Sequence, residues 1–114
     1  MTSAVFNQEK TKHSIVYSMS VSGHALYAKQ DDIVCAACSV LPQALYAGLI
    51  AAGYEPEYMQ NNEQAAVYLK CEAKNPLEAE CMEGMFVMAR AGFELLAKNY
   101  PENVSVAGET TKTN

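Results

Sequence analysis

Two long segments with helical spacing of apolar residues constrain the fold of this chain more than any other feature of its sequence. The first covers residues 33–52, where Asp31 or Asp32 can cap the start and Gly53 can end the helix. The second covers residues 77–99. A helix with one apolar face buries that face against another element, so both segments are expected to cover a sheet.

Three prolines give information on the boundaries and the continuity of the two expected helices. Pro42 lies inside the first segment and predicts a kink at residues 39–41, or alternatively a short helix that ends there and a second that begins. Pro76 fits the first turn of the second helix, with Asn75 as its cap. Pro101 follows the end of that helix.

Shorter segments between and around the helices have the alternating pattern of strands. The expected strands are residues 3–7, 12–21, 55–59, 64–72 and 104–106. The first two are joined by a polar turn at residues 8–11. The order β-β-α-β-β-α-β predicts an α+β domain, a small antiparallel or mixed sheet with two long helices, over residues 1–107. Residues 108–114 are expected to be a polar C-terminal tail.

The net charge, the apolar runs and the cysteine content indicate which classes of protein this chain can belong to. The net charge of −5 argues against a nucleic-acid binder, which would show a basic patch. The first residues lack a charged segment followed by an apolar one, and no apolar run approaches about 18 residues, so we expect a cytoplasmic protein outside the membrane. The four cysteines are then expected to be thiols. Half of the residues are hydrophobic, so the fold requires no disulfide or metal.

Residues that can carry chemistry gather between the second strand and the first helix. His24 follows Gly23 at the end of the strand, and Cys35 lies in the first turn of the helix. The partial positive charge of a helix N-terminus stabilises a thiolate, and a nearby imidazole would complete a Cys/His nucleophile pair. The alternative interpretation is a buried structural cysteine and a histidine in a loop.

Three neighbouring residues could support such a pair. Ser39 shares a helix face with Cys35 and can donate to the thiolate or bond to the Cys35 carbonyl. Asp32 is first a helix cap, and it could also orient His24 or shape the loop before the helix. Tyr27 is the one large side chain in that loop that we expect to be exposed.

The cysteines also allow two other sites. Cys35 and Cys38 form a C-x-x-C motif, which is typical of thiol–disulfide redox proteins, although no Pro or Gly separates them. Cys35, Cys38, Cys71 and His24 could together bind zinc, but no second C-x-x-C or H-x₃-H motif supports this. We therefore expect no metal and no cofactor.

Two segments taken together, Gly23-His24-Ala25 and Asp32-Ile33-Val34-Cys35-Ala36-Ala37, resemble the ribosomal-processing cysteine protease family of bacteria, which has phage-related members. Ser39 belongs to the same pattern. The resemblance continues in Gly92-Phe93-Glu94-Leu95 and spans about residues 2–106, nearly the whole chain.

The resemblance implies a cysteine endopeptidase of ribosome biogenesis, a thiol protease with His24 and Cys35 as its catalytic pair. Asp32 and Ser39 would lie close by, and the loop with Tyr27 would order over the substrate. Family members are small homodimers that remove a short N-terminal extension from a large-subunit ribosomal protein, cutting after an aromatic residue. Some relatives act on phage capsid or scaffold proteins.

The sequence departs from the family pattern near the expected site. Gln30 stands where the family usually has a glycine, and the loop between His24 and Cys35 is one residue shorter. Cys38 stands at a usually aliphatic position, which favours a packing role for this thiol. A competing hypothesis from another class is a non-catalytic binding protein on the same scaffold, which would recruit a ribosomal or phage protein.

Overall fold

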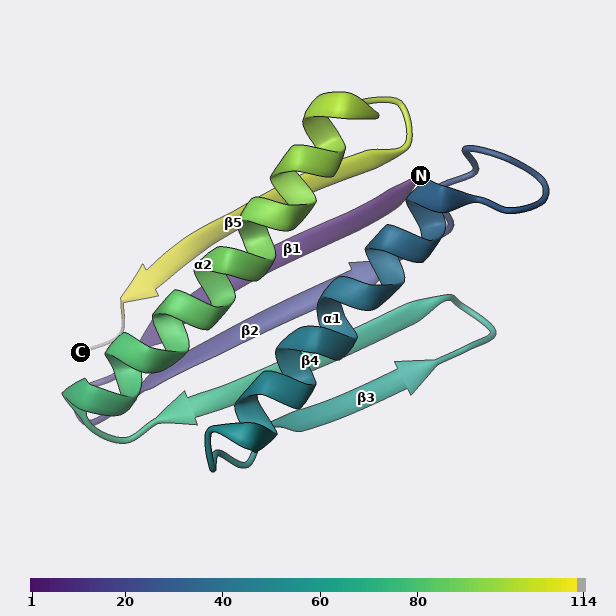
Figure 1. The fold of residues 1–114 in the computed structure, drawn as a ribbon. Helices are drawn as coiled ribbons and strands as arrows, with labels where there is room; N and C mark the ends of the chain where they lie inside the picture. The colour runs from purple at the N-terminus through teal and green to yellow at the C-terminus, as the bar shows by residue number, and fades with distance from the viewer. Residues whose placement is uncertain (113–114) are drawn as a thin grey trace.

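Five strands and two helices make up the computed structural model, which describes residues 1–112 (Figure 1). In chain order they are β1 (Thr2–Lys10), β2 (Ile15–Ser22), α1 (Ile33–Ala51), β3 (Glu57–Asn61), β4 (Ala66–Ala73), α2 (Pro76–Asn99) and β5 (Val104–Lys112). The predicted α+β class and the β-β-α-β-β-α-β order are confirmed.

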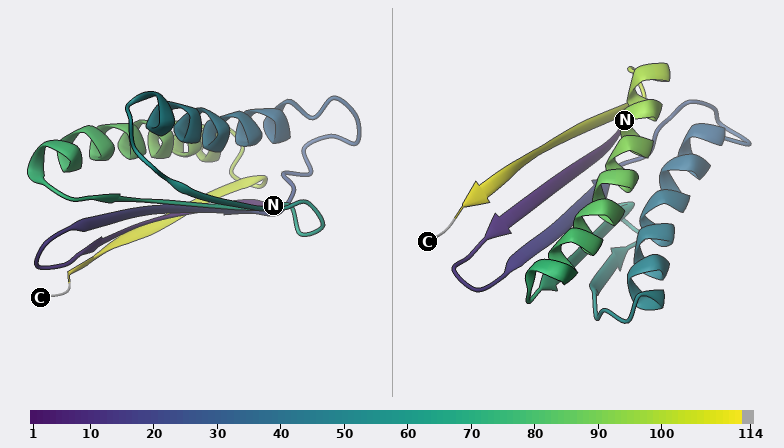
Figure 2. Two further views of the ribbon diagram at one scale, coloured as in Figure 1. Left: turned by 90° about the horizontal axis from the view of Figure 1, so that it is seen from below. Right: turned by 60° about the vertical axis from the view of Figure 1, so that its left-hand side comes forward.

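The strands form one mixed sheet with the order β3-β4-β2-β1-β5. β1 pairs antiparallel with β2 and parallel with β5, and the remaining pairs are antiparallel. Figure 2 shows that both helices cover the same face of this sheet. The core lies between the two layers, where Met19, Leu69, Leu49 and Phe93 are fully buried. In β2 the buried residues alternate along the strand, namely Tyr17, Met19 and Val21, as expected for a strand with one face in the core.

Pro42 does not divide the first helix. α1 is continuous through this residue, which is buried, so the alternative of two shorter helices is wrong. Asp32, rather than Asp31, is the N-cap. Gly53 follows the helix end with φ +91°, a conformation that glycine adopts without steric cost.

β1 and β5 are longer than their sequence patterns indicated, whereas β2 and β4 are shorter and begin later. The turn between β1 and β2 lies at residues 11–14, where Thr11 accepts the Ser14 amide hydrogen bond, rather than at residues 8–11. β5 does not end at Val106 but pairs with β1 as far as Lys112. Residues 108–112 of the expected polar tail therefore lie in the sheet, and residues 113–114 lie outside the described part.

Helix α1 is apolar enough, by length and composition, to cross a membrane. Core helices have the same property, and α1 packs Val34, Leu45 and Leu49 against the sheet. Its N-terminus lies at the end of the molecule where β2 stops and where β3 turns into β4 (Figure 1). The segments that carry His24 and Cys35 meet at this end.

Candidate active site

Cys35 is the third residue of α1 and is held in place by the helix cap. The Oδ1 atom of Asp32 accepts a hydrogen bond from the Cys35 amide at 2.9 Å, and the Asp32 carbonyl accepts one from Ala36 at 3.0 Å. The thiol of Cys35 is free and partly exposed. The cap side chain thus occupies the amide of Cys35, and the Ala36 amide makes the first hydrogen bond of the helix backbone.

Asp32 also shapes the loop that precedes the helix. Its Oδ2 atom accepts hydrogen bonds from the amides of Tyr27, at 3.0 Å, and Ala28, at 3.3 Å. The amide of Cys35, helped by those of Ala28, Tyr27 and Val34, lowers the pKa of the Asp32 carboxyl against an opposing effect of desolvation. Of the two extra roles considered for Asp32, these bonds support shaping of the loop.

His24 and Cys35 line the same cavity, which has a volume of about 240 Å³. His24 is exposed and follows Gly23, whose φ of +88° turns the chain at the end of β2. The Gly23 amide donates to the Ala65 carbonyl at 3.0 Å, which joins this segment to the start of β4. The structure therefore brings together the two residues that the sequence predicted as a pair.

Other residues that line the cavity were missed by sequence reasoning. They are Gln43 of α1 and several residues of β3 and of the turn that follows it, namely Tyr58, Gln60, Asn61, Asn62 and Ala65. Among the described residues that line this cavity there is no carboxylate, lysine or arginine. The only sequence signal was the run of amide side chains at residues 60–62, which reads simply as a polar turn.

Ser39 and Cys38 both line this cavity but have different environments. The hydroxyl of Ser39 donates to the Cys35 carbonyl at 2.9 Å, so it bonds to its own helix. Cys38 is buried, and this burial raises the pKa of its thiol, while hydrogen bonding with the Thr2 side chain acts in the opposite direction. Burial agrees with the packing role expected for Cys38.

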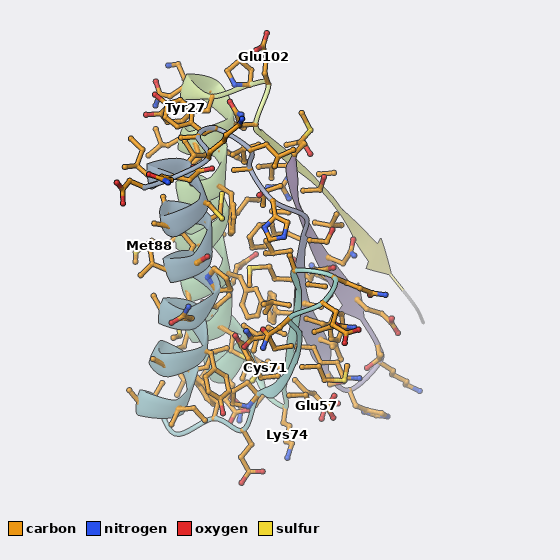
Figure 3. The ribbon with its side chains drawn as sticks, turned by 90° about the vertical axis from the view of Figure 1, so that its right-hand side faces the viewer. Tyr27, Glu57, Cys71, Lys74, Met88 and Glu102 are labelled. Atoms are coloured by element: carbon orange, nitrogen blue, oxygen red, sulfur yellow. The ribbon has the colours of Figure 1, made fainter. Side chains whose placement is uncertain are left out.

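Tyr27 lies at the end of the molecule near Glu102 (Figure 3). Its ring packs edge-on against Tyr100, with ring centroids 5.2 Å apart, and about half of the residue is exposed. Tyr27 is not among the residues that line the cavity of His24 and Cys35. A substrate-binding role for Tyr27 stays a prediction.

Cys71 lies far from the other proposed zinc ligands. Figure 3 shows it, with Glu57 and Lys74, toward the end of the molecule opposite Tyr27. These three residues line a separate and larger cavity of about 470 Å³, and burial raises the pKa of the Cys71 thiol. Within residues 1–112 no three His, Cys, Asp or Glu side chains form a group that could hold a metal ion. The alternative zinc site thus has no ligand set in this part of the chain.

Comparison with known proteins supports a single family. A crystal structure of SMU.848 from Streptococcus mutans is 27% identical, with a TM-score of 0.75 over 97% of this chain and 96% of that one. Two structures of the essential ribosomal processing protease Prp from S. aureus also match. The one with a covalently linked product peptide is 14% identical, with a TM-score of 0.70. The one with a substrate peptide is 12% identical, with a TM-score of 0.69. Each covers 93% of this chain and 99% of that chain.

No curated protein sequence matches this chain. The family model described as cysteine protease Prp matches residues 1–105, which is nearly all of it. The chain therefore belongs to the Prp family of cysteine proteases.

Proposed function

We propose that this protein is a cysteine endopeptidase that removes a short N-terminal extension from a large-subunit ribosomal protein. The observation that carries the proposal is the shared cavity of His24 and Cys35 in a chain of the Prp family. A partly exposed thiol that shares a cavity with an imidazole supports nucleophilic catalysis by such a pair.

The reaction begins when the Cys35 sulfur, as a thiolate, attacks the carbonyl carbon of the scissile bond. The imidazolium of His24 then protonates the leaving amine, and the C–N bond breaks to leave an acyl-enzyme. His24 next accepts a proton from a water molecule that attacks the thioester. The C–S bond then breaks, which releases the product as a carboxylic acid and restores the Cys35 thiolate and the His24 imidazolium.

The amide of Cys35 is a poor candidate for the oxyanion site. A helix N-terminus has unpaired amides that can hold an oxyanion. However, the Cys35 amide already donates to the Asp32 carboxylate. An oxyanion bound by this amide would have to displace that carboxylate, so we place its donors elsewhere in the cavity.

The proposed substrate is a basic ribosomal protein precursor with an aromatic residue before the scissile bond. The S. aureus relatives hold a substrate peptide and a covalently linked product peptide. A cavity lined by side-chain amides, a tyrosine and apolar residues, with no Asp, Glu, Lys or Arg among the described residues that line it, suits a neutral, extended segment of such a precursor. The net charge of −5 favours encounter with a basic protein in the cytoplasm.

The direct test is incubation with the extended ribosomal protein encoded in the same genome, followed by mass spectrometry of the products. Cys35→Ala is the control that must leave the substrate intact. Cleavage of a phage capsid or scaffold protein in its place would assign a phage substrate. Stable binding without cleavage by the wild type would favour the non-catalytic binding protein.

We further propose that the protein acts as a twofold homodimer. The outer face of the helices carries exposed apolar side chains, among them Val40 of α1 and Leu77 and Met88 of α2. Met88 points away from the sheet (Figure 3). An apolar groove of about 320 Å³, which includes Gly48 and Gly84, lies between the two helices. Exposed apolar surface of this kind marks interaction sites.

A further inference from the structure

Hydrogen bonds hold the backbone on both sides of His24. The hydroxyl of Thr2 donates to the Gly23 carbonyl at 3.2 Å. The side-chain amide of Asn103 donates to the Ala25 carbonyl at 2.9 Å. The residue before and the residue after the imidazole are therefore both held by side chains from other parts of the chain.

Thr2 and Asn103 are themselves joined. The Thr2 amide donates to the Asn103 carbonyl at 2.8 Å, at the point where β1 and β5 begin side by side. Thr2 is only 2% exposed. The backbone amide of Asn103 donates to the Tyr100 carbonyl at 2.9 Å. The two residues are thus hydrogen-bonded to each other and to the C-cap of α2. We call this pair the clamp.

The two residues that the clamp holds, one on each side of the exposed His24, are closely packed, whereas the loop after them is exposed. Ala25 is 1% exposed, and a side chain at Gly23 would collide with the carbonyl of Met1. Immediately after Ala25, Leu26 has a φ of +58° and is 74% exposed. The clamp thus ends where the exposed loop begins. His24 is fixed separately from the part of the loop that Asp32 holds.

We propose that Asn103, together with Thr2, is the positioning residue for His24. The clamp holds the His24 backbone so that the imidazole stays in the cavity of Cys35, independently of the exposed loop that Asp32 holds. This role rests on the proposed function. A shift of a catalytic group by about 1 Å can cost about a hundredfold in rate, so a single hydrogen bond at this place has a large effect.

The kinetic test compares Asn103→Ala with Asn99→Ala. Asn99 is a matched control, because its side-chain amide also donates to a backbone carbonyl, that of Leu95 at 3.0 Å, away from His24. We expect Asn103→Ala to lower kcat at least tenfold with KM within about twofold, and Asn99→Ala to keep both values. Asn103→Asp, which has the same size but no amide donor, should lose activity in the same way.

A second pair of variants tests the other half of the clamp. Thr2→Val keeps the shape of the side chain but removes the donor to Gly23, whereas Thr2→Ser keeps the hydroxyl. We expect Thr2→Ser to retain the wild-type kcat and Thr2→Val to lose several-fold. This pair decides the question even if Asn103→Ala fails to fold.

A readout that does not depend on activity comes from the two histidines of the chain. In imidazole NMR spectra, Asn103→Ala should shift the signals of His24 and leave those of His13, in the turn between β1 and β2, unchanged. Unchanged His24 signals, equal shifts of both histidines, or a wild-type kcat in Asn103→Ala would each overturn the positioning role. If the wild type cleaves no substrate, the proposed function fails, and the His24 signals alone decide the clamp.

Discussion

Replacing Gly23 by alanine should separate two costs that the structure assigns to this position. The first is the φ of +88°, which is unfavourable for a residue with a Cβ. The second is space, because the new Cβ would collide with the Met1 carbonyl. Gly53→Ala is the matched control, since Gly53 has nearly the same φ, +91°, but no atom within 4 Å of the added Cβ.

The magnitudes follow from these two terms. A left-handed φ costs alanine about 1–2 kcal/mol. Lower entropy of the unfolded chain returns about 0.4–1 kcal/mol of this. Gly53→Ala should therefore lose about 1 kcal/mol of unfolding free energy or less. Gly23→Ala carries in addition an overpacking cost of about 1–3 kcal/mol, near the upper end because the obstacle is backbone.

Urea denaturation monitored by circular dichroism measures both variants against the wild type. We expect Gly23→Ala to lie about 2 kcal/mol or more below Gly53→Ala, which corresponds to a melting temperature lower by about 8 °C. The same variant should reduce kcat, because Gly23 precedes His24. Equal losses of stability in the two variants would refute the close approach of β1 to the His24 segment.

Four further results are expected. In peptide cleavage assays, Cys35→Ala should abolish activity without unfolding the protein. Cys38→Val should keep most activity, because the buried volume is roughly retained. Equal loss of activity in the two variants would favour the redox alternative. Because its pKa is lowered in the folded state, Asp32 stabilises the protein above its unfolded pKa of about 3.9, and this contribution is lost as pH falls through the folded value. The stability difference between wild type and Asp32→Ala should thus be present at pH 7 and shrink in acid denaturation curves. In sedimentation experiments the wild type should be a dimer and Met88→Lys a monomer. A wild type that sediments only as a 12.4 kDa monomer at micromolar concentration would contradict the dimer. Replacing the aromatic residue of the substrate by alanine should lower kcat/KM at least tenfold, about 1.4 kcal/mol, and equal cleavage of both peptides would argue against a pocket for that residue.

Local features of the sequence were sufficient for the two helices and for the neighbourhood of His24 and Cys35. Helical periodicity, the Asp32 cap and the glycine at residue 53 each depend on residues that are close together in the sequence, so they can be recognised from the sequence alone. The distance along the chain from His24 to Cys35 is also short. A strand end followed by a helix start was enough to predict that both residues face one cavity.

Contacts between distant parts of the chain decided the rest. β5 reaches Lys112 because parallel pairing with β1 satisfies the backbone of a polar segment that has no strand pattern of its own. The amide-rich β3–β4 turn became a wall of the cavity only when the sheet placed it beside α1. The structure also chose among roles that the sequence left open, since Ser39 bonds to its own helix and Asp32 holds the loop.

The clamp on His24 shows why the sequence alone was insufficient. Asn103 and Ala25 are 78 residues apart, and their contact is one hydrogen bond from an amide to a carbonyl. Such a bond depends on the parallel alignment of β1 and β5 and has no periodicity or motif that a sequence could reveal. The sequence by itself determined which residues could do the chemistry, whereas the tertiary structure decided what holds the histidine in place, because only folding brings the two strand starts together.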